Sequence, residues 1–300
     1  MDFLSISAHR RQLGFETPLR LSYFTMNPKL MHSTGKAFTY RYMIHPGVCL
    51  NGKTVSLSTY LAIIDSLTTF ALVGAHESAK SSRPGVSVQL QAELNHNASS
   101  PAEEVDIIST VTKLGGKLAF IRAEVRTVDT GDLVCFASHI KYLPTGSWMM
   151  DFLFSSWGWH LMKIYLQRLP AAPAPEDSSI LEAIKPYLEP RGLGLASFTV
   201  KKEHNNGFET LHGGCQSILM EIVSQPMAKE ELKSDQIKLE SIQVAFAASG
   251  RGTVDIVTKV LSKGDKSMTV RVSLLRSDGK VISEGTLRWS IASAQGQSKL

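Results

Sequence analysis

The stretch that decides the fold is EHNNGFETLHGGCQSILMEIV, residues 203–223, in which two glycines stand directly before an apolar run. The run 215–223 is compatible with a helix, so the backbone amides of Gly213 and Gly214 are expected at the helix N-terminus. Amides at that position bind anions and can stabilise an oxygen on which negative charge develops. Glycine also lets a ligand carbonyl come close to the backbone. The alternative interpretation of His212 followed by two glycines is a tight loop without a ligand.

A diverged internal repeat favours the first interpretation. VDIISTV at residues 105–111 recurs as VDIVTKV at residues 254–260, an offset of about 150 residues. The same spacing continues through the pairs Gly115/Gly264, Lys117/Lys266 and Arg122/Arg271. After a slip of one residue, DTGDLV at 129–134 matches SDGKVI at 277–282, and both patterns are typical of a turn between strands. The chain therefore contains the same structural unit twice.

Each half is expected to form one long helix followed by strands. In the first half the helix runs from Val55 to about Val73 and is apolar on most faces, as expected if a sheet wraps around it. The strands of this half are expected at 85–94, 105–112, 118–128 and 133–143. In the second half we expect a helix at 213–223 and strands at 237–247, 253–262, 268–275 and 281–291. Strands that follow a helix, rather than alternating with helices, indicate an α+β fold.

Three passages carry a resemblance to a known family: DSLTTFAL at 65–72, PGVSV at 84–88, and residues 203–214. Residues 35–143 and 193–291 each resemble a PaaI-like, acyl-CoA thioesterase 13-like hotdog-fold thioesterase. The resemblance implies a double hotdog, in which two long helices are each wrapped by an antiparallel β-sheet. The implied domains are an N-terminal extension (1–34), a first hotdog (35–147), an aromatic-rich connector with a proline-rich linker (148–192) and a second hotdog (193–300).

The resemblance also implies a composite site. In that family two hotdog subunits pair, and each site takes an Asn and a His-Gly-Gly segment from one subunit and an acidic helix residue and a Ser from the other. Carried over by position, the implied catalytic residues are Asp65 and Ser87 from the first half and Asn206 and Gly213 from the second, with His212 and Gly214 as substrate contacts. One site between the halves is therefore expected to be complete.

The reciprocal site lacks a His-Gly-Gly segment, because the start of the first helix reads NGKTVSLS at 51–58. Glu221 takes the place of the acid there and is expected to contact substrate. The position that corresponds to Ser87 falls near Leu239, in a strand whose register the sequence does not fix. We expect this second site to be inactive or to serve for binding only.

Hydrolysis of a thioester needs donors aimed at the oxygen that becomes an oxyanion, and one such donor is worth about 100- to 1000-fold in rate. The Gly213 amide is the expected donor, and Asn206 can position the carbonyl or the water. Asp65 acts as general base or attacks directly, and its apolar neighbours in the helix would make it a stronger base. Ser87 holds the water or orients Asp65, unless it is a strand hydroxyl bonded to the backbone.

Other chemistries have less support. No cysteine or carboxylate cluster accompanies His204 or His212 at ligand spacing, so loop shaping is expected of both histidines, and neither a metal nor a cofactor is expected. A Gly-x-Ser-x-Gly elbow is absent, and Cys215 lacks a partner base. A hotdog hydratase resembles a pattern with His five residues after the helix Asp, where this chain has Phe70. The rival from another class is a non-catalytic acyl-CoA or lipid-binding protein.

Composition agrees with a two-lobed globular protein of 300 residues that is 43% hydrophobic. The net charge of +5 suits an anionic ligand such as coenzyme A, and nucleic-acid binding has no motif behind it. Candidate contacts for the phosphates are Lys113, Lys117, Arg122, Lys141 and Arg251, although for any one of them a solvated surface position is the more common interpretation. The three cysteines form no paired framework, which predicts a reducing, cytoplasmic location, with a mitochondrial presequence as the alternative. The resemblance implies a homodimer of double-hotdog chains.

The connector WMMDFLFSSWGWHLMKIYL at 148–166 is rich in aromatic residues and Met. Asp151, His160 and Lys163 make it a poor transmembrane span. Three interpretations stay open: packing against the sheet, a wall of an acyl tunnel in which Trp157 contacts substrate, and peripheral contact with a membrane surface.

Overall fold

The computed structural model describes residues 29–44, 46–49, 54–75, 85–95, 103–143, 180–206 and 209–292. The strands of the first half are β1 (Lys29–Thr34), β2 (Ala37–Met43), β3 (Val86–Leu94), β4 (Glu104–Leu114), β5 (Leu118–Thr127) and β6 (Leu133–Tyr142). Those of the second half are β7 (Leu188–Gly192), β8 (Leu195–Thr199), β9 (Ile237–Phe246), β10 (Thr253–Lys263), β11 (Ser267–Arg276) and β12 (Val281–Ile291). The α-helices are α3 (Leu57–Ala75), α6 (Ile180–Ile184) and α7 (Gly213–Leu232), with short 3-10 helices at Pro46–Val48, Lys185–Tyr187 and Lys202–His204.

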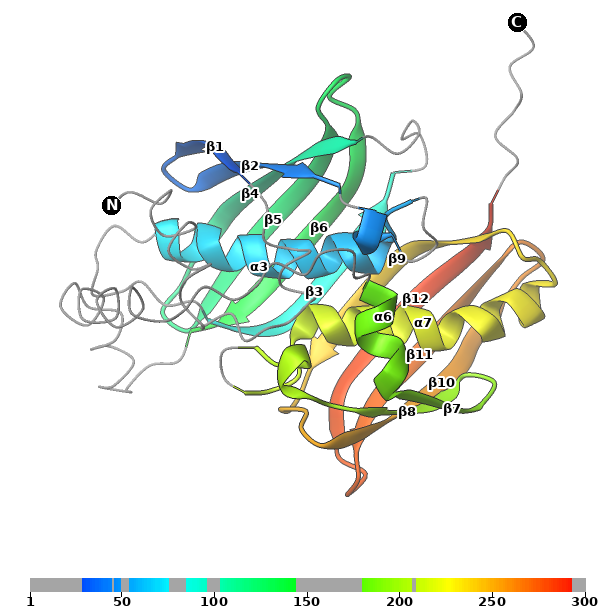
Figure 1. Cartoon of the computed structure of the whole chain (residues 1–300). Helices are drawn as coiled ribbons and strands as arrows, with labels where there is room; N and C mark the ends of the chain where they lie inside the picture. Colours follow the sequence, from blue (N-terminus) through cyan, green and yellow to red (C-terminus); the bar gives the residue numbers. More distant parts are fainter. Residues whose placement is uncertain are drawn as a thin grey trace, which may run out of the picture.

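These strands form a single antiparallel sheet of 12 strands in the order β1-β2-β4-β5-β6-β3-β9-β12-β11-β10-β8-β7 (Figure 1). The halves join where β3 pairs with β9, and Gln91 lies opposite Gln243 at the centre of that pairing. Outward from this pair, both halves repeat the same order of strands. The internal repeat seen in the sequence is therefore an approximate two-fold symmetry of the sheet.

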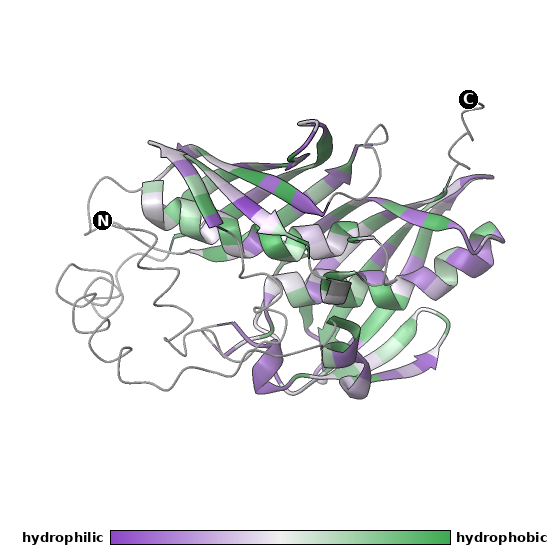
Figure 2. Cartoon of the chain, turned by 45° about the horizontal axis from the view of Figure 1, so that its top comes forward, coloured by the Kyte–Doolittle hydropathy of each residue, from purple (hydrophilic) through white to green (hydrophobic). Residues whose placement is uncertain are grey.

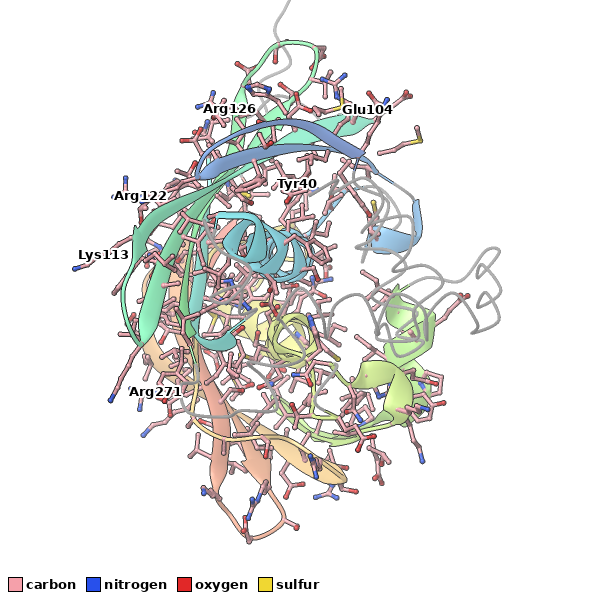
Figure 3. All side chains as sticks on the ribbon, turned by 90° about the vertical axis from the view of Figure 1, so that its left-hand side faces the viewer. Tyr40, Glu104, Lys113, Arg122, Arg126 and Arg271 are labelled. Carbon is pink, nitrogen blue, oxygen red and sulfur yellow. The ribbon has the colours of Figure 1, made fainter. Side chains whose placement is uncertain are left out.

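The two long helices lie on the same, concave side of the sheet (Figure 3). Helix α3 contacts β2 to β6 and the first strand of the other half, β9, while α7 contacts β9 to β12. The helices also pack against each other, with Gly214 near the start of α7 directly against Ala62 of α3. The expectation of two sheets, one around each helix, therefore needs correction: pairing of β3 with β9 makes both of them halves of one sheet.

Alternation along the strands explains how the sheet presents one face to the helices. In Figure 2 hydrophobic and hydrophilic residues alternate along most strands, which is the period-two pattern of a sheet with one buried face. Helix α3 is apolar on most faces because the sheet and α7 cover it, and Leu61, Ile63, Ile64 and Leu67 are fully buried. The core thus lies between the sheet and the two helices.

The predicted elements of both halves are confirmed within one or two residues at most ends. The main difference is α7, which begins at Gly213 as predicted but continues beyond Val223 to Leu232. Strands β1 and β7 lie in the segments predicted as extension and connector. Most of the extension, and residues 148–179 of the connector with Trp157, lie outside the described residues. Within the described ranges, no helix is long and apolar enough to cross a membrane.

Candidate functional site

A bulge in β3 turns Ser87 toward the helices. Ser87 lies opposite Lys141 of β6, and the next pair is Gln89 with Ile140, so Val88 is an extra residue in β3. Successive residues of a strand point to opposite faces, and one extra residue reverses that alternation. As a result Ser87 faces the same side as the buried Leu90, three residues further on, and its hydroxyl reaches α3.

Asp65, in the middle of α3, is the centre of the site and is only 4% exposed. Its Oδ1 accepts a hydrogen bond from Ser87 Oγ at 3.1 Å. His139 Nε2 and Lys141 Nζ lie 3.6 and 3.8 Å from the same oxygen. The other oxygen, Oδ2, faces the second half: His212 Nε2 lies 3.7 Å away. The two carboxylate oxygens are thus divided between the halves of the chain.

The start of α7 completes the site from the second half. His212 is the N-cap, and its Nδ1 accepts a hydrogen bond from the Gly214 amide at 3.0 Å. This bond places the imidazole proton on Nε2, the nitrogen turned toward Asp65. In the part of the chain that the structure describes, the Gly213 amide has no acceptor. A Cβ atom added at Gly213 would lie 2.9 Å from Asp65 Oδ2, so this glycine directly adjoins the carboxylate.

Gly213 and Gly214 of the His-Gly-Gly segment have different roles. A Cβ atom at Gly214 would lie 2.7 Å from the Cα atom of Ala62, which is backbone of the neighbouring helix. Gly214 therefore allows α3 and α7 to pack closely, and its amide is already used by His212. Gly213 is the one whose amide is available beside Asp65.

Asn206 lies on the loop that leads into α7. Its Oδ1 accepts hydrogen bonds from the Thr210 amide at 3.3 Å and from Thr210 Oγ1 at 3.1 Å, which fixes the orientation of the carboxamide. Asn205 pairs with Leu211, so the loop folds back directly before His212. This returns Asn206 to the start of α7.

His204 has a structural role. It is fully buried, its Nε2 donates to the Ala183 carbonyl at 3.0 Å, and its Nδ1 accepts from the Lys201 amide at 3.0 Å. Both ring nitrogens are therefore used, as in a neutral imidazole. Burial lowers the pKa of His204, which also favours the neutral ring. The expectation that this histidine shapes the loop agrees with these contacts.

Two site residues were not assigned to the site from the sequence. His139 joins a hydrogen-bonded chain in which Thr68 Oγ1 lies 2.7 Å from Nδ1 and Ser87 Oγ lies 3.0 Å from Nε2. Because Ser87 gives its proton to Asp65, His139 Nε2 donates to Ser87. Thr68 Oγ1, which bonds to the other ring nitrogen, also donates to the Ile64 carbonyl at 2.6 Å. Lys141 was expected as a surface contact for phosphates, but it is buried beside Asp65. The available signal was the pair of polar residues at inward positions of a strand, His139 and Lys141.

Electrostatics in this site favour an ionised Asp65. Burial acts to raise the pKa of Asp65, but His212, Lys141, His139 and the Ser87 hydrogen bond outweigh it and lower the pKa to about 2. Burial lowers the pKa of His139 to about 3 and also lowers the pKa of His212. Both histidines are therefore neutral near pH 7, and Lys141 is the cation that faces Asp65 there.

No protein-family model and no curated protein matches the chain. Solved structures do. The chain is similar to a 12:0-ACP thioesterase from Umbellularia californica, with 11% identity, a TM-score of 0.58, and coverage of 87% of this chain and 100% of that one. It is also similar to an acyl-CoA thioesterase II, TesB2, from Mycobacterium marinum, with 11% identity, a TM-score of 0.52, and coverage of 93% and 99%. A conserved protein with a hot dog fold from Alicyclobacillus acidocaldarius gives 10% identity, a TM-score of 0.54, and coverage of 91% and 98%. The chain has the hotdog fold.

The second hotdog half contains a counterpart of the Asp65 position. Glu221 is the ninth residue of α7, as Asp65 is of α3, and it is also buried. Its Oε2 accepts a hydrogen bond from the Ser58 amide at 3.3 Å, at the start of α3. Burial raises the pKa of Glu221, although hydrogen bonds from Ser58 and Ser56 oppose that effect. The acid of this hotdog half therefore bonds to the other helix directly.

The strand register that the sequence left open is fixed by a second bulge. Leu239 lies opposite Trp289 and the next pair is Ser241 with Arg288, so Glu240 is the extra residue, as Val88 is in β3. Leu239 thus occupies the position of Ser87, and Trp289 that of Lys141. Leu287 occupies the position of His139, by the same register. Around Glu221 the polar strand residues of the first half are replaced by apolar ones.

The described residues contain no set of metal ligands, because nowhere among them do three or more His, Cys, Asp or Glu side chains lie together. Two of the residues expected to meet phosphates, Lys113 and Arg122, lie on the convex face of the hotdog sheet, away from the helices (Figure 3).

Proposed function

We propose that the chain is an acyl-thioester hydrolase whose one composite site lies between the two hotdog halves. The observation that carries the proposal is the meeting of Asp65 with Gly213. A buried, ionised carboxylate of the first half adjoins an amide at the helix N-terminus of the second half, and that amide has no acceptor among the described residues. This combination supplies a base or nucleophile and an oxyanion donor at one point.

In the proposed reaction the thioester carbonyl oxygen accepts a hydrogen bond from the Gly213 amide. The α7 dipole strengthens that donor, because the helix N-terminus favours negative charge. Asn206 supplies a second contact to the carbonyl, and Thr210 holds its carboxamide in place. As the carbonyl carbon becomes tetrahedral, negative charge grows on an oxygen that these donors already face.

Asp65 acts through Oδ2, because Oδ1 is bonded to Ser87. As general base, Oδ2 takes a proton from water, the hydroxide oxygen bonds to the carbonyl carbon, and the carbon–sulfur bond breaks to release the thiolate. As nucleophile, Oδ2 itself bonds to the carbonyl carbon, the thiolate leaves, and water then hydrolyses the mixed anhydride. A single turnover in ¹⁸O-labelled water that leaves label in the Asp65 carboxylate identifies the anhydride route, because label enters Asp65 only when water attacks the Asp65 carboxyl carbon of the anhydride.

For the substrate we propose acyl-CoA. Support comes from the net charge of +5, which suits the phosphates of coenzyme A, and from similarity to a structure named as an acyl-CoA thioesterase II. Similarity to a structure named as an ACP thioesterase makes acyl carrier protein the competing carrier. His212 Nε2 faces the site, which supports the proposed contact of His212 with substrate. A contact of Trp157 with substrate stays a prediction. Pairing of two chains, peripheral membrane contact, the PaaI-like subtype and the cytoplasmic location also stay predictions.

The test measures hydrolysis of matched acyl-CoA and acyl-ACP panels by wild type, Asp65→Asn and Asn206→Ala. Asp255→Asn is the matched control, because it removes a carboxylate from β10 that pairs with Arg191 at a distance from the helix start. We expect wild type and the control to turn over acyl-CoA and both site variants to lose most of kcat while they remain folded. Binding of acyl-CoA without hydrolysis by wild type would instead favour the non-catalytic binding protein.

A further inference from the structure

We propose that Lys141 is a positioning residue of this site, whose buried ammonium group keeps Asp65 in the ionised form that the reaction needs. The inference rests on the proposed function for its consequences in catalysis, but the charge pairing can be measured without any substrate. It assigns to the site a lysine whose residue type alone suggests an ordinary surface residue.

Lys141 points into the interior of the protein. Strand β6 is inward-facing at Lys141, which lies opposite Ser87 of β3. The lysine is 3% exposed, and its Nζ lies 3.8 Å from Asp65 Oδ1. A charged side chain is almost never buried to this degree without a partner of opposite charge. Asp65 is that partner, and each side chain offsets the cost of burying the other.

The neighbouring backbone makes room for this lysine. Gly85 has a φ of +66°, and a Cβ atom added there would lie 3.0 Å from the Cβ atom of Lys141 and 3.1 Å from the Tyr142 carbonyl oxygen. A residue with a side chain would therefore be strained in its backbone and crowded against β6. Gly85 leaves space at the point where Lys141 enters the site, directly before the bulge that turns Ser87 inward.

The second hotdog half is an internal control for the charge effect. Glu221 occupies the helix position of Asp65 and is similarly buried, but Trp289 stands at the position of Lys141. Burial raises the pKa of Glu221, whereas the neighbours of Asp65 reverse the effect of burial and lower its pKa. Two carboxyl groups at equivalent positions thus differ in the direction of their pKa shift, and among the described residues a cation adjoins only Asp65.

Four side chains of the described residues face Asp65. Ser87 approaches from β3, His139 and Lys141 from β6, and His212 from the start of α7. Ser87 is uncharged, and burial lowers the pKa of both histidines so that they are neutral near pH 7. The pKa of Lys141 is itself lowered by burial, which outweighs the opposing effect of Asp65. Lys141 still has the highest ordinary pKa of the histidine and lysine side chains that face Asp65, so it is the one that can carry a positive charge near pH 7.

The first experiment titrates Asp65 directly by carbon-13 NMR of the aspartate carboxyl groups, with the Asp65 signal assigned from its loss in Asp65→Asn. Wild type is compared with Lys141→Met, and Lys113→Met is the matched control because it removes the same charge from an exposed position of β4. We expect the Asp65 midpoint to rise by about 1 to 3 pH units in Lys141→Met. The control should leave it unchanged. An equal midpoint in Lys141→Met and wild type would overturn the proposal.

The second measurement follows kcat/KM for acyl-CoA hydrolysis against pH. The acid limb of the profile should move upward in Lys141→Met by the same amount as the Asp65 midpoint, because protonated Asp65 is inactive. Activity on the alkaline side of the new midpoint should recover toward that of wild type. A uniform loss at all pH values would mean that Lys141 supports only the packing of the site. If neither protein hydrolyses acyl-CoA, the proposed function fails, while the NMR titration still decides the charge pairing.

A third variant covers the case in which Lys141→Met folds but is too unstable for the NMR titration. Removal of one member of a buried ion pair leaves the other uncompensated, whereas removal of both does not. The double variant with Asp65→Asn and Lys141→Met is therefore expected to have a higher thermal midpoint than Lys141→Met alone. A double variant no more stable than the single one would show that the two charges are not coupled, which overturns the proposal.

Discussion

Two buried carboxyl groups at the ninth position of their helices have different surroundings. Asp65 is held at one oxygen by Ser87 and presents the other to the start of α7. Glu221 is one methylene longer and bonds directly to the Ser58 amide at the start of α3. Ser58 is the second residue of α3, the position that Gly214 has in α7, so in the second half the acid itself bonds to the start of the opposite helix. The lack of a His-Gly-Gly segment is therefore only part of the difference between the halves.

The strands account for the rest of the contrast. Around Asp65 the inward positions of β3 and β6 carry Ser87, His139 and Lys141, which bind and neutralise a carboxylate. The equivalent positions around Glu221 are Leu239, Leu287 and Trp289. A buried acid is thus not sufficient for a site: polar strand neighbours that hold the carboxylate are also needed. In the second half the acid has become a cap that ties α7 to the start of α3.

Neutralising each acid in turn should give the largest difference between the two halves. Asp65→Asn should lower kcat by at least about 100-fold, because the variant loses the base or nucleophile while it keeps the shape of the side chain. Glu221→Gln should leave kcat unchanged, because an amide oxygen can still accept the Ser58 hydrogen bond. Both are checked by steady-state hydrolysis of acyl-CoA with circular dichroism for folding. Equal losses would mean that both acids take part in catalysis.

A second test separates the two glycines at the start of α7. In Gly214→Ala the new methyl group meets the Ala62 backbone at 2.7 Å, which cannot move aside cheaply, so the free energy of unfolding should fall by about 1 to 3 kcal/mol. Gly213→Ala instead places its methyl group against Asp65 Oδ2 and the Phe246 ring, and it should lower kcat while changing stability less. Urea unfolding and kinetics on the same preparations measure both. The reverse assignment would give Gly214 the catalytic role.

The two acids should also give opposite dependence of stability on pH. The pKa of Asp65 is lower in the folded chain than in the unfolded one, so its contribution is present above about pH 4 and is lost as pH falls toward 2. The pKa of Glu221 is raised, so stability falls as pH rises from its unfolded value through its folded one. Asp65→Asn should reduce the loss of stability at acid pH. Glu221→Gln should reduce the loss of stability as the pH rises through the folded pKa of Glu221. Urea unfolding across a pH series measures both slopes, and slopes of the same sign would contradict the comparison.

Much of this arrangement can be predicted from the sequence. The repeat between 105–111 and 254–260 predicts two equivalent halves, and the alternation of apolar residues predicts their strands. The glycines at 213 and 214 mark the start of α7, because local capping chemistry is visible in local sequence. The end of that helix is different. Pro226 normally interrupts a helix, but α7 continues through it to Leu232 and ends at Lys233 with a left-handed backbone.

The strand side of the site could not be predicted in the same way. Bulges at Val88 and Glu240 shift the alternation by one residue, and no residue type in either strand marks them. The identity of the residue equivalent to Ser87 therefore depended on a register that only the pairing of β9 with β12 fixes. Lys141 falls at an inward position, but a lysine is normally placed at the surface unless its partner is known. That partner, Asp65, lies on a helix far away in the sequence.

The smallest effect is expected from Glu221→Asp. This variant tests whether the length of the Glu221 side chain prevents ligand binding beside it. The shorter carboxylate should no longer reach the Ser58 amide, and loss of this cap should lower the free energy of unfolding by about 1 kcal/mol. The variant gains no second site, because Leu239 and Trp289 still offer nothing to hold an aspartate as Ser87 and Lys141 do. Calorimetric titration with an unreactive acyl-CoA thioether should therefore show one equivalent bound per chain before and after the change. A second equivalent bound by the variant would mean that the length of the Glu221 side chain alone prevents ligand binding in the second half. The apolar strand residues would then not be the cause.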